Sequence, residues 1–196
     1  MTNQQCGTSR IAGVQFTLFP MSDNFVDIIL SALDEVDHSS VWKETDDVTT
    51  CMRGKIVHIF DITKAIFLHA AKTGEHVAMS GTFSVGCPGD NEADVYMAES
   101  DEPVNAPNLS ANEQQAGCKF AIHPLGRDDY MDKIYEQIDL SKARGVDVSP
   151  SHYMTRLDGD VASIFDAMEE AFEAVQQEVS HTTMTFTISA NSPSNR

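Results

Sequence analysis

Apolar and polar residues alternate at positions 14–18, where Val14, Phe16 and Leu18 are the apolar members. A period of two is typical of a strand that buries one face. The sequence therefore predicts a first strand here, which Pro20 ends.

The rest of the first half follows as a small mixed unit. Apolar residues at helical spacing over 25–33 predict a helix, with Ser22 or Asp23 as its cap. Gly54 interrupts the pattern before a second helix, and Gly74 is the expected C-cap after it. The predicted order is strand, helix, strand, strand, helix, strand, with the last four elements at 41–45, 48–53, 56–71 and 76–85.

The second half of the chain repeats the first. Adding 105 to a residue number maps Ile59, Phe60 and Asp61 onto an identical triplet, and a shift of 104 applies before the turn after the first strand. Chance does not supply an ordered series that keeps its register in this way. Further matching pairs are Asp27 and Asp132, Thr50 and Thr155, Gly54 and Gly159, Phe67 and Phe172, and Ser84 and Ser189. The second copy is predicted at 118–123, 130–143, 146–149, 152–157, 161–178 and 182–190.

This element order is that of the ferredoxin-like split βαβ unit. We expect the α+β class, as a tandem repeat of two ferredoxin-like βαββαβ units with antiparallel sheets: residues 1–89, an acidic linker at 90–116, and residues 117–196. Helices cover one face of such a sheet and leave the other open. The open faces can cover each other or a second subunit, so a homodimer is expected.

Composition narrows the functional classes. The 196 residues are 41% hydrophobic, without an apolar run long enough to span a bilayer, and the default expectation is a soluble, cytoplasmic protein. A net charge of −17 argues against a nucleic-acid partner, because such binding needs clustered Lys and Arg. An acidic field draws cations, although acidity also serves solubility alone. The four cysteines show no CxxC pairing, which disfavours a disulfide scaffold or a zinc site.

No catalytic signature is present, and the histidines do not cluster at metal-ligand spacing. We expect no metal, no cofactor and no enzyme activity. An enzyme of pyrimidine salvage with Cys87 or Cys51 as nucleophile is one alternative, and a ligand-sensing regulatory module is another.

Small hydroxyl side chains recur on the predicted strands. Each alone is explained by the strand preference of threonine, but the set, near Trp42 and Asp47, suits a flat polar heterocycle. Glycine-bracketed loops before the first strand and after the last could close over a ligand with Arg10 or Cys87 pointing inward, or could be tight turns with Arg10 paired to a surface carboxylate. The expected ligand-binding residues are Arg10, Thr17, Trp42, Asp47, Thr49, Thr50, Ser80, Thr82, His152, Thr155, Thr185 and Thr187.

These features resemble the YkoF-type family of thiamin/hydroxymethylpyrimidine-binding proteins. The resemblance rests on the repeat and on 6–13 (CGTSRIAG), 41–42 (VW), 49–50 (TT), 52–54 (MRG) and 189–193 (SANSP). It implies ACT-like tandem repeats, a homodimer, and binding of thiamin through its pyrimidine moiety at a site in each repeat. It also implies a role in uptake or salvage of thiamin precursors, with a membrane transporter as a further partner.

The two copies differ at several positions that bear on ligand binding. Trp42 falls opposite Asp147, Arg53 opposite Asp158 and Thr17 opposite Ala121. The sequence therefore predicts two unequal sites.

Overall fold

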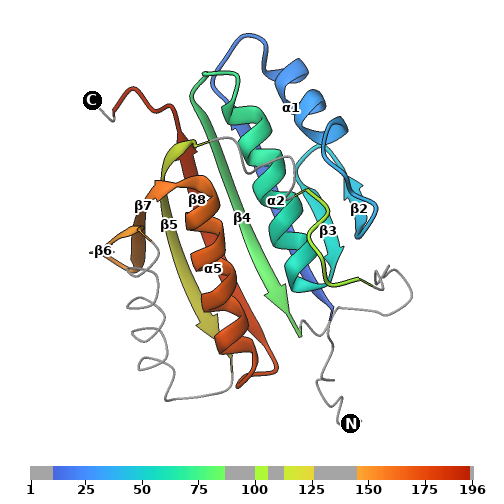
Figure 1. The fold of residues 1–196 in the computed structure, drawn as a ribbon, viewed down its shortest axis with the longest axis vertical. Coiled ribbons are helices and arrows are strands. Elements are labelled where there is room, and N and C mark those ends of the chain that lie inside the picture. The colour runs from blue at the N-terminus through green and yellow to red at the C-terminus, as the bar shows by residue number, and fades with distance from the viewer. Residues whose placement is uncertain (1–10, 87–99, 106–112, 126–144, 195–196) are drawn as a thin grey trace.

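The computed structural model describes residues 11–86, 100–105, 113–125 and 145–194. The first repeat contributes β1 (Ala12–Pro20), α1 (Phe25–Asp34), β2 (Trp42–Thr45), β3 (Thr50–Gly54), α2 (Ile56–Ala71) and β4 (Val77–Val85). The second contributes β5 (Gln115–Pro124), β6 (Asp147–Ser151), β7 (Met154–Asp160), α5 (Val161–Gln176) and β8 (Thr182–Ala190). The α+β class and the duplicated unit are confirmed (Figure 1).

The strands of both repeats form one antiparallel eight-stranded sheet in the order β2-β3-β1-β4-β8-β5-β7-β6. The repeats join through β4 and β8, which pair along their whole length. Gly81 pairs with Phe186, its own equivalent 105 positions later, so a pseudo-twofold axis passes through this pair. The open faces of the two repeats therefore lie side by side, and the alternative in which they cover each other is wrong.

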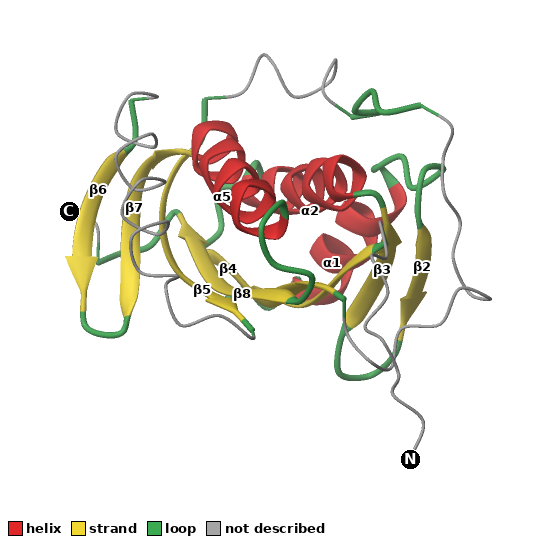
Figure 2. Cartoon of the chain, turned by 90° about the horizontal axis from the view of Figure 1, so that it is seen from below, coloured by secondary structure: helices red, strands yellow, loops and turns green. Residues whose placement is uncertain are grey.

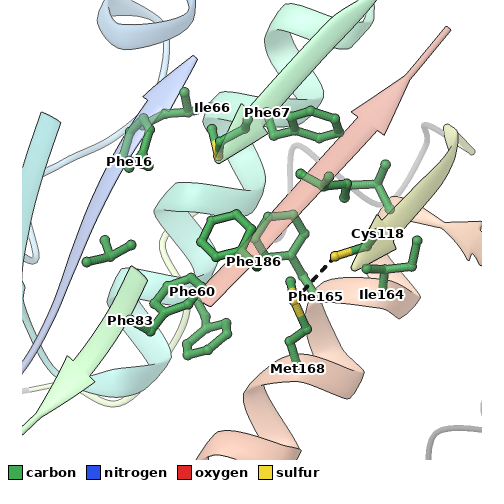
Figure 3. Close-up of a cluster of buried hydrophobic side chains, with 14 of the residues drawn as sticks. Phe16, Phe60, Ile66, Phe67, Phe83, Cys118, Ile164, Phe165, Met168 and Phe186 are labelled. Atoms are coloured by element: carbon green, nitrogen blue, oxygen red, sulfur yellow. Dashed lines mark hydrogen bonds between the residues drawn. The ribbon is translucent and has the colours of Figure 1, made fainter. Parts of the chain in front are cut away.

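The described helices α1, α2 and α5 all lie on one face of the sheet (Figure 2). Alternate strand residues point toward them and are buried, as Val14 and Phe16 of β1 are. At the centre Phe83 stacks on Phe60 with ring centroids 3.9 Å apart, and on Phe186 at 5.0 Å (Figure 3). One continuous core thus joins the two repeats, as expected when a single sheet carries both.

Several predicted boundaries agree with the structure and others shift. The ranges 56–71 and 182–190 are those of α2 and β8, whereas β5 already begins at Gln115, inside the predicted linker. At α1, the Ser22 hydroxyl accepts a hydrogen bond from the Asn24 N–H at 3.3 Å, but Asn24 is the N-cap. The predicted helix at 130–143 lies outside the described residues.

Residues 100–105, from the predicted linker, pack against the first repeat. Asn105 is only 4% exposed, and its backbone N–H and Nδ2 donate to Asp61 Oδ2 of α2 at 2.9 and 3.1 Å. Its side-chain amide also exchanges two hydrogen bonds with the backbone of Asp37, both 3.0 Å long. This part of the linker is therefore held on α2 and on the loop that follows α1.

Candidate functional site

A cleft of about 160 Å³ opens between α1, the end of β1 and the β2–β3 hairpin. Its apolar wall comes from the helix-facing side of β1 and from α1, and its polar wall comes from the hairpin. Sites for drug-sized ligands measure roughly 300–1,000 Å³, so this cleft is the size of one ring rather than of a large molecule. The lining residues are Phe16, Thr17, Leu18, Ile29, Leu33, Thr45, Asp46, Asp47, Val48, Thr49 and Thr50.

The hairpin turn that forms the polar wall is fixed by its own side chains. Asp46 Oδ1 accepts hydrogen bonds from the backbone N–H groups of Val48 and Thr49, both at 2.8 Å. The bonds from Thr49 and then Val48 hold the pKa of the Asp46 carboxyl below its usual value. Thr17 Oγ1 donates to Val48 O at 2.9 Å, which ties β1 to the turn. The turn is thus pre-formed, and Asp46 is negatively charged at neutral pH.

Two threonines contribute hydroxyl groups to the polar wall. The hydroxyls of Thr45 and Thr50 lie 3.0 Å apart, and Thr50 is buried on the helix-facing side of β3. A hydroxyl both donates and accepts, so this pair can serve either kind of ligand group. Asp47 is exposed at the rim and makes no hydrogen bond or ion pair with the described residues. The arrangement offers an apolar slot, adaptable hydroxyls and a negative rim.

The structure divides the expected ligand-binding residues among different places. Thr17, Asp47, Thr49 and Thr50 line the cleft together. By strand alternation and pairing, another set lies on the open face of the sheet, opposite the helices, where Ser80 and Thr187 hydroxyls approach to 3.0 Å. Arg10 lies outside the described residues. The open-face set is Trp42, Ser80, Thr82, Thr185 and Thr187.

His152 and Thr155 belong to the β6–β7 hairpin of the second repeat. They are the equivalents of Asp47 and Thr50, so they take the corresponding places around the second hairpin turn. His152 and its neighbour Tyr153 are exposed, and Tyr153 adopts a positive φ of 66°. The predicted helix at 130–143, which would supply the facing wall, lies outside the described residues. At the two turn positions where the first repeat has the carboxylates of Asp46 and Asp47, the second repeat has Ser151 and His152 and thus no carboxylate.

Seven cleft residues were not among the expected ligand-binding set, and four of these have a sequence pattern that marks them as core. Phe16 and Leu18 alternate as buried strand residues, and Ile29 and Leu33 belong to the apolar stripe of α1. Ile29 and Leu33 are only partly buried, at the edge of that stripe. Ile29 and Leu33 are four residues apart on α1, and the Asp46–Asp47 turn follows later in the chain. This combination is the one sequence signal that could have located the cleft.

Metal and membrane features were also sought in the described parts of the chain. No three His, Cys, Asp or Glu side chains gather there so that they could hold a metal ion. None of the described helices combines the length and apolar character that crossing a bilayer requires.

Fold and cleft together define a tandem ferredoxin-like protein with a small, pre-formed cleft. The model of the YKOF-related family matches residues 11–90 and 115–195, one stretch in each repeat. A protein of Bacillus subtilis (strain 168) named "Putative HMP/thiamine-binding protein YkoF" is 47% identical over 191 residues, which cover 97% of this chain and 96% of that protein. The chain belongs to the YKOF-related family, and the resemblance read from its sequence is confirmed.

Two solved structures are similar to part of the chain. Hypothetical protein MJ1052 from Methanocaldococcus jannascii matches 38% of this chain and 78% of its own, with a TM-score of 0.36 and 24% identity. Protein SP2199 from Streptococcus pneumoniae matches 38% of this chain and 83% of its own, with a TM-score of 0.34 and 19% identity.

Proposed function

We propose that this protein binds thiamin through its hydroxymethylpyrimidine moiety, without changing it chemically, in the cleft between α1 and the β2–β3 hairpin. The observation that carries the proposal is the one-ring size of the cleft together with its negative rim. The name of the Bacillus subtilis relative supports the choice of ligand.

Each wall of the cleft has a partner in the proposed ligand. The pyrimidine ring packs against Phe16 and Leu18, because an aromatic ring buries best against apolar and aromatic side chains. Its ring nitrogens and amino group need both donors and acceptors, which the Thr50 hydroxyl and the hairpin backbone supply. The thiazolium, a fixed cation, stays outside the slot beside Asp46 and Asp47, where negative charge favours it.

The second repeat carries a second, weaker site around the β6–β7 hairpin. Ser151 and His152 replace Asp46 and Asp47, and Ala121 replaces Thr17. The attraction for the cation is therefore smaller there, and the hydroxyl that ties the first turn to β1 is missing. Two unequal sites per chain are the expected stoichiometry.

A second copy of the chain covers the open face of the sheet in a twofold homodimer. The centre of that face carries small side chains, among them Ser80, Thr82, Thr185 and Thr187, so it is flat enough for a sheet to pack on it. The expected mass by light scattering is twice 21.5 kDa. Thr187→Arg, a bulky charge at this surface, should shift it toward the monomer. A wild-type monomer would refute this part of the proposal.

In the cell, such a binding protein serves thiamin-precursor uptake or salvage in the cytoplasm and exchanges ligand with a membrane transporter. The cysteine-nucleophile alternative finds little support in the cleft. Cys51 lies on the open face of β3, across the sheet from the cleft, and Cys87 is outside the described residues.

The test is a titration with thiamin, hydroxymethylpyrimidine and thiamin phosphates that follows both heat and the chemical identity of the ligand. Binding of thiamin and of hydroxymethylpyrimidine with complete recovery of unchanged ligand is expected. Consumption of ligand would replace the binding function by an enzymatic one. An absence of heat with all of these compounds would refute the proposal.

A charge variant tests the orientation of the ligand. Asp47→Asn should weaken thiamin binding about fivefold at low salt, as expected for a lost charge pair in a solvent-exposed site, and the effect should shrink as salt is added. Binding of uncharged hydroxymethylpyrimidine should not change. Asp27→Asn, which removes the same charge from the exposed side of α1, is the matched control. Equal losses for both ligands would contradict the proposed orientation.

A further inference from the structure

Both charged side chains that line the cleft are acidic. Asp46 and Asp47 lie at its rim, and no Lys, Arg or His is found among the described residues of the lining. Lys43, the nearest basic residue along the chain, lies two positions before Thr45 on β2 and is not part of the lining. The mouth of the cleft is therefore negatively charged.

The backbone of the hairpin turn has no donors left for an anion at the two positions where it bends. Consecutive backbone N–H groups in a turn are a common binding element for phosphate. Here the N–H groups of Val48 and Thr49 both donate to Asp46 Oδ1 at 2.8 Å. The same two bonds hold the pKa of the Asp46 carboxyl below its usual value, so the group stays charged. The place that a phosphate oxygen could take is thus held by a carboxylate of the chain itself.

α1 turns its C-terminal half toward the cleft. Leu33 lines the cleft from the last turn of the helix, residues 31–34, which the structure describes in full and which contains no basic residue. The carbonyl groups left unpaired at a helix C-terminus carry partial negative charge and disfavour an anion. The N-terminal end of α1, which would attract a phosphate, begins at Phe25 and does not belong to the lining. The helix therefore adds to the negative potential.

On the basis of the binding function proposed above, we infer that the cleft of the first repeat selects the free alcohol form of its ligand and rejects the phosphate ester. The hydroxyl group of hydroxymethylpyrimidine is attached where thiamin carries its thiazolium. A phosphate on that oxygen puts negative charge beside Asp46 and Asp47 in place of a cation. The protein then acts before any phosphorylation of its ligand at this hydroxyl, because the phosphorylated product competes poorly for the cleft.

The size of the selection follows from the charges. One unit charge beside an exposed carboxylate changes binding about fivefold at low salt, so a dianion that faces one such group loses about 25-fold. A phosphate ester carries nearly two negative charges at neutral pH. Hydroxymethylpyrimidine phosphate should therefore bind at least about 25-fold more weakly than hydroxymethylpyrimidine. Thiamin phosphate should lose less, because its phosphate lies beyond the thiazolium.

The second repeat should select less strongly. Its equivalent turn has Ser151 and His152 in place of the two carboxylates. Amide chemical shifts caused by hydroxymethylpyrimidine phosphate should therefore be larger around His152 than at 45–50. The alcohol should give the reverse pattern.

Calorimetric titration of the full-length protein with hydroxymethylpyrimidine and with its monophosphate, at low salt, tests the selection. The quantity compared is the ratio of the two dissociation constants within one variant, which a partly unfolded fraction does not change. The wild-type ratio should be at least about 25, and Asp47→Lys should lower it at least about tenfold. Asp27→Lys makes the same charge change on the exposed side of α1 and should leave the ratio unchanged. Asp46→Asn keeps the oxygen that holds the turn but loses the charge, and should lower the ratio about fivefold.

Two results overturn the inference while the binding function stands. One is binding of the alcohol with equal or tighter binding of the phosphate ester at 45–50, and the other is a ratio that Asp47→Lys and Asp27→Lys change alike. If neither thiamin nor hydroxymethylpyrimidine binds, the proposed function is wrong, and the inference fails with it.

Discussion

Gly81 and Phe186 occupy equivalent positions in the two repeats, yet glycine has no side chain and phenylalanine has a large one. They face each other on the pseudo-twofold axis, where two identical side chains would compete for the same space. A Cβ added at Gly81 would lie 2.6 Å from Gln15 O, 2.8 Å from Phe16 Cβ and 3.0 Å from Phe186 Cε1. The Gln15 contact is with backbone, so it cannot be relieved by a side-chain rotation.

We expect Gly81→Ala to lower the free energy of unfolding by about 1–3 kcal/mol, the usual cost of overpacking a core. Phe186, 1% exposed and stacked on Phe83, should cost about 3–5 kcal/mol when truncated to Ala. The double variant should be close to the sum, because shortening Phe186 leaves the clash with the Gln15 carbonyl in place.

Urea unfolding followed by circular dichroism measures these values, and Gly13→Ala is the matched control. Gly13 is also a strand glycine of the first repeat, but an added Cβ would come no closer than 3.5 Å to Met52 O. Its replacement should change stability by no more than about 0.5 kcal/mol. Equal effects of Gly81→Ala and Gly13→Ala, or full rescue of Gly81→Ala by Phe186→Ala, would refute the packing argument.

Two further expectations concern the linker and a buried thiol. Asn105→Ala removes the amide that bridges Asp61 and Asp37. It should lower the free energy of unfolding in urea by about 2–3 kcal/mol, because buried polar partners are left without hydrogen bonds. An unchanged unfolding midpoint would contradict the role given to this segment. Burial raises the pKa of the Cys118 thiol. Iodoacetamide should therefore not alkylate Cys118 in the native protein at pH 8, as peptide mass spectra can show. Labelling of Cys118 at the rate of the unfolded chain would contradict its burial.

The elements of the fold could be predicted because each follows from local pattern. The helix at 56–71 lies between Gly54 and Gly74, and the strand at 182–190 alternates without interruption. The way the repeats join could not be predicted, because it depends on which strand edges pair across the chain. Within its own repeat, each of β4 and β8 is an edge strand whose outer side has no partner. The two strands pair with each other through these edges, so the repeats join side by side and not face to face.

The candidate site was only partly predictable for a related reason. Serine and threonine occur on both faces of the sheet, so these residue types alone do not indicate which face a strand position occupies. Thr50 points toward the helices, whereas Thr82 points away from them, and the two therefore lie on opposite sides of one sheet. The cleft also depends on how α1 sits against the hairpin turn, which is a tertiary arrangement. Its apolar wall of Ile29 and Leu33 reads as ordinary core in the sequence.

The central claim is the position of the ligand, and amide chemical-shift mapping during a titration with hydroxymethylpyrimidine tests it most directly. The cleft and the open face of the sheet both contain residues expected to bind, so the map distinguishes them. Shifts should concentrate at 45–50 and near Leu33, with smaller ones around His152. Shifts confined to Ser80, Thr82, Thr185 and Thr187 on the open face would contradict the account.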